Sequence, residues 1–362
     1  MALSTDFALR NITQKFVESL DGEDREFLEE ICSKKRGLSF DDFEENFTLL
    51  EASYENLRKY QSFIRSDVGK KFLKRFGLKD PKLQLHEAII ERIYKGYISR
   101  VLEIIHGNVR LDKIQEKISK FVSFLVDEIA SNDKTYIFTL NYDLLVETIL
   151  LQYVGSDGFT DFCCPSGKLK GTEIDKFDFN PRRNEEFFSD TNQNVELHHL
   201  HGSLSLFYDF DRNRAVKLRS QDIGYEEIYR KIYAERMPLT PAIITGGGKS
   251  DKIVQYPFDF YYRSMKDLCD SGQPSKFFIV GYSFRDQHIN DLIKRWLKNV
   301  QEYSKGLLIV DYKTSQKERE DFMSFVRKQI PKKPAIPEFC FEFGGVEAIH
   351  DITGTKAKKK RR

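Results

Sequence analysis

The second part of the chain alternates short apolar runs with helical segments, and this alternation constrains the fold more than any other feature. The runs are rich in β-branched and aromatic residues and are continuously apolar. Continuous apolar strands that alternate with helices are typical of a parallel sheet covered by helices on both faces. We therefore predict an α/β fold. The expected strands are residues 136–139, 242–245, 277–280 and 307–310, and the expected helices are residues 144–151, 286–298 and 314–329.

The first third of the chain reads as helix almost throughout. Two stripes of apolar residues recur at intervals of three and four, at residues 90–105 and 111–129, which predicts helices that each bury one face. We expect residues 1–132 to form a helical region packed on a core of residues 133–346. Residues 155–194 are rich in glycine and proline, so we expect them to form a loop over the surface or over a site.

Composition excludes several classes of protein. The 58 Lys and Arg nearly balance the 56 Asp and Glu, so no global charge attracts nucleic acid or anionic lipid, and we expect any link to nucleic acid to be indirect. No apolar run approaches the roughly 18 residues of a membrane span. The five cysteines form no CxxC pair, which argues against a disulfide framework and a zinc module. We expect a cytoplasmic protein whose basic tail, residues 347–362, is disordered.

Asn141 and Asp143 end the first expected strand. Ligands bind at the carboxyl ends of strands in open α/β sheets, so both residues are candidates for chemistry. The alternative is that Asp143 caps the helix that follows, as Asp and Asn often do.

Histidines form the second candidate cluster. His198, His199 and His201 lie within four residues, just before Gly202 and Ser203. On a strand, His199 and His201 would share one face. A metal site is one interpretation, but no Cys or carboxylate set at ligand spacing completes it. A general base with a pKa near neutrality is the second interpretation, and a core histidine bonded to backbone is the third.

The third candidate is the segment after the expected strand 277–280, with Gly281, Ser283 and Asp286. Backbone amides in a turn before a helix form an anion seat, although Asp286 as a plain helix cap is the alternative. A further segment, Gly246–Ser250, resembles the end of a P-loop. It lacks the first glycine and the following helix of that motif, so we reject a P-loop and keep Lys249 as a candidate phosphate contact.

Together these segments resemble one family. Thr139-Leu-Asn141-Tyr-Asp143 resembles the sirtuin T-x-N-x-D segment, and His201-Gly-Ser resembles the sirtuin H-G-S. Residues 278–290 look like the third motif of the bacterial sirtuin-like group. The motif sequences NYD, HLHGS and GYSFRDQHIN are similar to those of sirtuin-like proteins of bacterial anti-phage systems.

The resemblance implies a Rossmann-like core and NAD as the substrate, with cleavage of the nicotinamide–ribose bond by water. On this basis Asn141 orients the ribose or the water, Asp143 holds the ribose or the carboxamide, and His201 is the general base. The resemblance further implies a homo-oligomer that works with a HerA-like ATPase or an Argonaute-like partner, and of these we expect the HerA-like ATPase. The residues that it places against NAD are Thr139, Gly202, Ser203, Gly281, Tyr282, Ser283 and Asp286.

Two features depart from the family pattern. The four-cysteine zinc module of typical sirtuins is missing, so we expect no metal, and much of the case for an acyl-peptide substrate is lost with it. The Gly-rich loop that normally opens the family is also missing, because no glycine precedes Gly22. Either the true start lies upstream, or this version binds NAD without that loop. The alternative to an NAD-hydrolysing effector is therefore a catalytically silent nucleotide-binding or scaffold subunit.

Overall fold

The structure is a computed structural model. It describes residues 111–181, 194–209, 212–219, 224–234, 239–244, 252–299 and 306–349, residues 66–77, and isolated residues elsewhere between 14 and 237. Most of the expected helical region 1–132, Lys249 and most of the basic tail therefore lie outside the described residues. The helices are α4 (Asp67–Arg75), α6 (Leu111–Ser131), α7 (Leu145–Tyr153), α9 (Tyr225–Ala234), α11 (Phe258–Ser271), α12 (Gln287–Asn299), α13 (Gln316–Gln329) and the 3-10 helix η3 (Glu338–Cys340).

Parallel strands form the centre and one side of the molecule. In one sheet, β5 lies between β1 and β2, and in a second sheet, β10 lies between β9 and β11, with all pairings parallel. These strands alternate with α7, α12 and α13 as the sequence predicts, so the Rossmann-type α/β prediction is confirmed. The strands are β1 (Thr135–Thr139), β2 (Phe159–Thr160), β5 (Val195–His199), β9 (Phe277–Val280), β10 (Leu307–Val310) and β11 (Phe341–Glu342).

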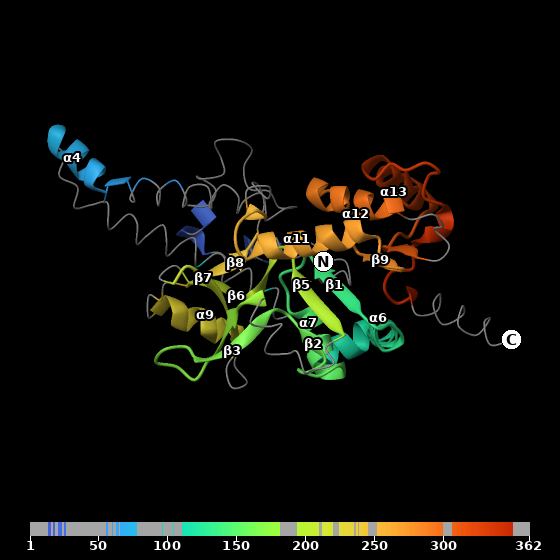
Figure 1. Ribbon diagram of the computed structural model, residues 1–362, viewed down its shortest axis with the longest axis horizontal. Coiled ribbons are helices and arrows are strands. Elements are labelled where there is room, and N and C mark those ends of the chain that lie inside the picture. The colour runs from blue at the N-terminus through green and yellow to red at the C-terminus, as the bar shows by residue number, and fades with distance from the viewer. Residues whose placement is uncertain are drawn as a thin grey trace.

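Helices cover both faces of the β1–β5–β2 sheet. On one face Leu197 packs with Ile129 of α6 and Leu150 of α7. On the other face the ring of His198 contacts Phe260 and Tyr261 of α11. Both sides of β5 are therefore covered, and four of its five residues are buried although it carries Glu196, His198 and His199. In Figure 1, α11 and α12 lie above this sheet and α7 lies below it.

A five-stranded antiparallel sheet, in the order β3-β4-β7-β6-β8, lies beside the parallel strands (Figure 1). The sequence did not predict it. Residues 155–194, expected to be loop, contribute β2, β3 and β4. The expected strand 242–245 is the end of an antiparallel strand. The strands are β3 (Cys163–Lys168), β4 (Asp175–Phe179), β6 (Gly202–Asp209), β7 (Arg214–Arg219) and β8 (Leu239–Ile243).

The reason for this error is local. Pro165 and Gly167 read as loop residues, yet they lie where the β3–β4 register shifts, and such irregularities admit proline and glycine into strands. β4 carries Asp, Lys, Phe, Asp and Phe, so it lacks the continuous apolar character of β9 and β10.

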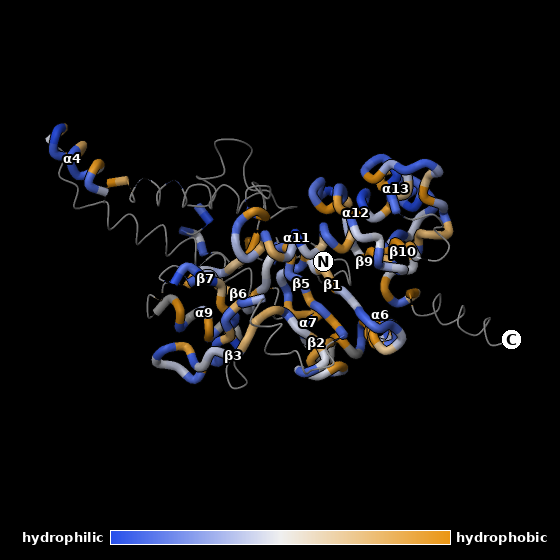
Figure 2. Tube along the Cα trace, viewed as in Figure 1, coloured by the Kyte–Doolittle hydropathy of each residue, from blue (hydrophilic) through white to orange (hydrophobic). Residues whose placement is uncertain are grey.

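Amphipathic helices complete the core. In α12, Ile289, Leu292, Ile293, Trp296 and Leu297 are all buried and follow the i, i+3, i+4, i+7, i+8 spacing of one helix face. The alternation of hydrophobic and hydrophilic residues along the helices is visible in Figure 2.

The stripe at 111–129 is likewise confirmed, because its residues lie in α6. This helix joins the two parallel sheets. Phe124 of α6 contacts the ring of Phe278 in β9 at 5.1 Å, and Lys276 forms an ion pair with Glu128 at 2.6 Å. Among the described residues, no helix is long and apolar enough to cross a membrane.

Candidate active site

The carboxyl ends of β1 and β5 bring the first two sequence motifs together. Thr139 pairs with His199 in the parallel register, so both chains leave the sheet at the same edge. The Leu200 amide then donates to the Thr139 carbonyl at 3.0 Å, and the Leu204 amide donates to the Tyr142 carbonyl at 2.8 Å. The segment that carries Asn141 and the segment that carries His201 are therefore bonded side by side.

The turn after β1 is braced by its own side chains. The Thr139 hydroxyl accepts from the Asn141 amide at 3.1 Å, which fixes the backbone that carries the Asn141 side chain. Asp143 is buried, and its Oδ1 accepts from the Leu145 amide at 2.9 Å at the start of α7. Asp143 thus bonds an amide of the first turn of α7, although the N-cap position itself is Leu144, whose side chain makes no capping bond. Burial raises the pKa of the Asp143 carboxyl.

His201 lies on the connection between two sheets. β5 ends at His199 and β6 begins at Gly202, so the expectation that His199 and His201 share a strand face is wrong. Gly202 has φ +88°, and a Cβ there would lie 1.9 Å from the Ala242 carbonyl oxygen. Only glycine fits this position. The His201 carbonyl accepts from the Ile244 amide at 2.8 Å, which fixes the turn from the side of β8.

The turn between β9 and α12 is held in an unusual backbone conformation. Gly281 has φ +62° and the buried Phe284 has φ +56°, a region that a bulky residue rarely adopts. The Asn290 side chain stabilises this conformation, because its Nδ2 donates to the Phe284 carbonyl at 2.9 Å. The Tyr282 hydroxyl donates to the Asp286 carbonyl at 2.9 Å. The turn thereby presents Asp286 directly before α12.

The Asp286 side chain, in the turn before α12, approaches the His201 side chain, in the connection between β5 and β6. The His201 Nε2 lies 3.8 Å from the Asp286 Oδ2, and the two side chains are only 5% and 18% exposed. A carboxylate beside an imidazole orients it and stabilises its charged form. The histidine motif and the third motif therefore form one site, at the strand-end edge where open α/β sheets bind ligands. Such a site is suited to proton transfer on a substrate that carries hydroxyl groups.

A family model of the SIR2-like domain matches residues 135–329, more than half of the 362-residue chain. The chain belongs to the SIR2-like family. The match covers β1, the His201 turn and the Asp286 turn, and it ends with α13. SIR2-like domains are often NAD-dependent enzymes. No curated protein matches the chain.

The remaining predicted site residues differ in their surroundings. Ser203 is buried, and its Oγ lies 3.1 Å from the Ser205 Oγ, so its hydroxyl is engaged inside the antiparallel sheet. Ser283 is exposed in the turn after β9. The Thr139 hydroxyl accepts a hydrogen bond from the Asn141 amide within its own turn. Within the described ranges no group of three His, Cys, Asp or Glu residues is arranged to hold a metal.

Sequence reasoning missed a buried ion cluster beside the site. Lys217 of β7 is 1% exposed and bonds Glu147 of α7 at 2.6 Å and Asp161 beyond β2. Arg219 lies 2.9 Å from both carboxylates. Burial alone would raise the pKa of both carboxyls, but the two cations hold each pKa below its usual range. The available signal was a lysine between the apolar residues Val216 and Leu218.

His199 lies next to this cluster, which we call the Lys217 cluster. Burial, followed by the positive charge of Lys217, lowers the pKa of His199 to about 4. The imidazole is therefore neutral at physiological pH and buried in the core, but the bond to backbone expected of a core histidine is not made within the described part of the chain. Its two ring nitrogens have no hydrogen-bond partner among the described residues.

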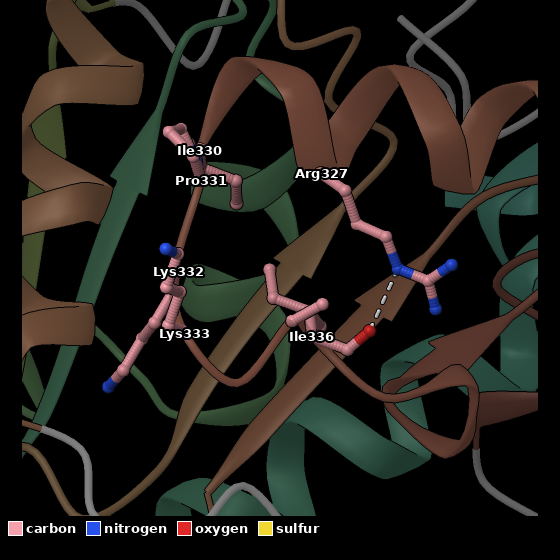
Figure 3. Close-up of a pocket in the computed structure, with 7 residues that line it drawn as sticks. Arg327, Ile330, Pro331, Lys332, Lys333 and Ile336 are labelled. Atoms are coloured by element: carbon pink, nitrogen blue, oxygen red, sulfur yellow. Dashed lines mark hydrogen bonds between the residues drawn. The ribbon is translucent and has the colours of Figure 1, made fainter.

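A pocket of about 310 Å³ lies elsewhere, between Arg327 and Ile336. It follows the carboxyl end of α13, a helix that starts near the carboxyl edge of the sheet and returns, so the pocket is at the opposite edge from His201. Figure 3 shows the Arg327 side chain turned to the Ile336 carbonyl, to which its Nε donates at 2.9 Å. Lys332 bonds the Leu297 carbonyl. These cations are engaged with backbone, and we assign the pocket no part in the site.

Proposed function

We propose that this SIR2-like protein is an NAD glycohydrolase, which cleaves the nicotinamide–ribose bond with water as the acceptor. The observation that carries the proposal is the contact between His201 and Asp286 at 3.8 Å. It lies at the strand-end edge of a SIR2-like domain, and the Asn141 segment is hydrogen-bonded beside it.

The chemistry assigns a role to each of these side chains. The bond from ribose C1′ to the nicotinamide nitrogen breaks, and its electron pair stays with the nicotinamide. Water forms the new bond to C1′, and its proton passes to His201 and then to solvent. Asp286 holds the imidazole and stabilises the charge that develops on it. Asn141 orients the water or the ribose, and the nearby carboxylates favour the positive charge of the oxocarbenium-like transition state.

Asp143 has a different role in this proposal. Its Oδ1 accepts a hydrogen bond from the Leu145 amide, so one carboxylate oxygen is engaged with the first turn of α7. Asp143 therefore acts mainly by fixing the Asn141 turn relative to α7.

We further propose that the protein is an effector of bacterial anti-phage defence, acting by abortive infection through NAD depletion. The support is the similarity of its three motif sequences to those of sirtuin-like proteins of anti-phage systems. Uncontrolled hydrolysis would deplete the NAD pool of the host, so the proposal includes an inactive state, a homo-oligomer and a HerA-like ATPase partner that regulates it.

Nicotinamide release from NAD tests the proposal. Purified protein, alone and with the products of neighbouring genes, is expected to release nicotinamide and ADP-ribose. Asn141→Ala and His201→Ala are each expected to lower turnover at least about 100-fold, the usual contribution of a positioned base. NAD turnover that persists in both variants would refute the mechanism. Binding of ADP-ribose without turnover under any condition would favour the silent nucleotide-binding or scaffold subunit instead.

A further inference from the structure

Side chains of three elements interact with Asp286. Tyr282 belongs to the same turn, and its hydroxyl donates a shared hydrogen bond to the Asp286 carbonyl at 2.9 Å and to the Asn290 Oδ1 at 3.0 Å. His201 approaches the Asp286 carboxylate from the connection between β5 and β6. The third element is α11, which contributes Tyr262, and the charge of Asp286 acts on the Tyr262 hydroxyl.

Tyr262 differs from Tyr282 in its hydrogen bonding. Both rings are partly buried in the same apolar cluster. The Tyr262 hydroxyl is buried and has no hydrogen-bond partner within the part of the chain that the structure describes. Burial, and then the negative charge of Asp286, raises the pKa of Tyr262, so the hydroxyl keeps its proton and remains a donor.

A buried donor without a partner destabilises the free protein. Phenylalanine would fill the same space without that penalty. The hydroxyl therefore has a physical rationale if a bound molecule provides an acceptor beside Asp286.

The charge of Asp286 selects the kind of acceptor. A phosphate placed beside this carboxylate would be repelled, whereas a sugar hydroxyl donates to the carboxylate and accepts from the tyrosine. We infer that Tyr262 is a substrate-contacting residue whose hydroxyl donates to an oxygen of the ribose that carries nicotinamide. This inference rests on the proposed function, because it identifies which part of NAD lies beside His201 and Asp286.

The test compares Tyr262→Phe with wild type in the full-length protein, by calorimetric titration with ADP-ribose and with ADP. ADP lacks the terminal ribose, so it separates the ribose contact from contacts to the rest of the nucleotide. Tyr262→Phe is expected to bind ADP-ribose roughly 5- to 20-fold more weakly, the effect of one hydrogen bond to a ligand. Its affinity for ADP is expected to stay within about twofold, as expected when no hydrogen bond is lost.

Thermal unfolding without ligand provides an independent readout. Tyr262→Phe is expected to leave the Tm unchanged or raise it, because it removes an unpaired buried donor. Tyr282→Phe is the matched comparison and is expected to lower the Tm, because its hydroxyl has two partners. Tyr153→Phe, at the exposed end of α7, controls for the loss of a hydroxyl elsewhere.

Equal ADP-ribose affinity of Tyr262→Phe and wild type would overturn the inference, as would a Tm loss equal to that of Tyr282→Phe or a wild type that binds no ADP-ribose. A wild type that binds ADP-ribose but does not cleave NAD would refute the hydrolase. In that case the Tyr262 contact would still be decided by the affinities of the two nucleotides.

Discussion

Replacement of Lys217 by methionine removes one cation from the Lys217 cluster while keeping most of the side-chain volume. Glu147 and Asp161, which are 4% and 6% exposed, would then share Arg219 alone. Breaking a buried ion pair by removing one partner costs about 3–5 kcal/mol. Arg219 still lies 2.9 Å from each carboxylate, so we expect a loss of about 3 kcal/mol, near the lower limit.

Urea unfolding at pH 7 measures this loss. The matched control is Lys294→Met in α12, whose partner Asp291 is 55% exposed, and which should change the free energy of unfolding by less than about 1 kcal/mol. The double variant Lys217→Met, Glu147→Gln restores charge balance around Asp161 and Arg219. It should be more stable than Lys217→Met alone, because it removes the carboxylate left without its lysine.

The pH dependence provides a second readout of the same reasoning. Without Lys217, burial raises the pKa of Glu147 above its unfolded value, so protonation stabilises the folded variant as the pH falls. The deficit relative to wild type should therefore shrink between pH 7 and pH 5. A Lys217→Met protein within 1 kcal/mol of wild type, or a deficit independent of pH, would refute the reasoning.

Three further predictions concern stability. Gly202→Ala should cost at least about 2 kcal/mol and disturb the His201 turn, because both φ and the Ala242 carbonyl oppose a side chain. His199 has a folded pKa of about 4 against about 6.5 unfolded. Its effect on the free energy of unfolding is therefore fully favourable above pH 6.5, and the protein loses about 3 kcal/mol of that free energy in total as the pH falls towards 4. Ser315→Ala should cost about 1 kcal/mol, because Ser315 and Glu318 form a capping box at α13.

Each of these has its own comparison. Gly171→Ala isolates the backbone cost, since Gly171 has φ +77° but nothing within 4 Å of its Cβ position; equal losses at Gly171 and Gly202 would contradict the steric argument. His199→Leu should flatten the stability profile between pH 6.5 and 4, apart from the part due to His198, whose pKa burial also lowers. For Ser315, differential scanning calorimetry decides, and an unchanged Tm would count against the cap.

The parallel strands and their helices were predictable because their signals are local. β9, β10, α12 and α13 each carry a complete apolar pattern and lie within about two residues of their expected bounds. The antiparallel sheet was not predictable in the same way. Its strands β3 and β4 pair across a glycine-containing irregularity, and the pairing rather than the composition makes them strands.

The residues of the candidate site show the same difference between local signals and long-range contacts. Asn141, His201 and Asp286 could be named as candidates because each lies in a short local motif, and the structure brings the His201 and Asp286 side chains to within 3.8 Å. Tyr262 and Lys217 were missed because their significance depends on neighbours far away in sequence. Lys217 meets Glu147 and Asp161 across separations of 70 and 56 residues, and a single sequence carries no record of that contact.

The His201 turn has a consequence for how variants of this protein will behave. His201 lies where the chain passes from the β1–β5–β2 sheet into the antiparallel sheet, while Asp286 follows a strand of the third sheet. Their separation of 3.8 Å therefore depends on how the β1–β5–β2 sheet packs against the antiparallel sheet and against the sheet that contains β9. Loss of one methyl group deep in either interface shifts the imidazole against the carboxylate without touching a ligand. A screen for altered activity will accordingly recover substitutions scattered through the cores between sheets, alongside those that line the site.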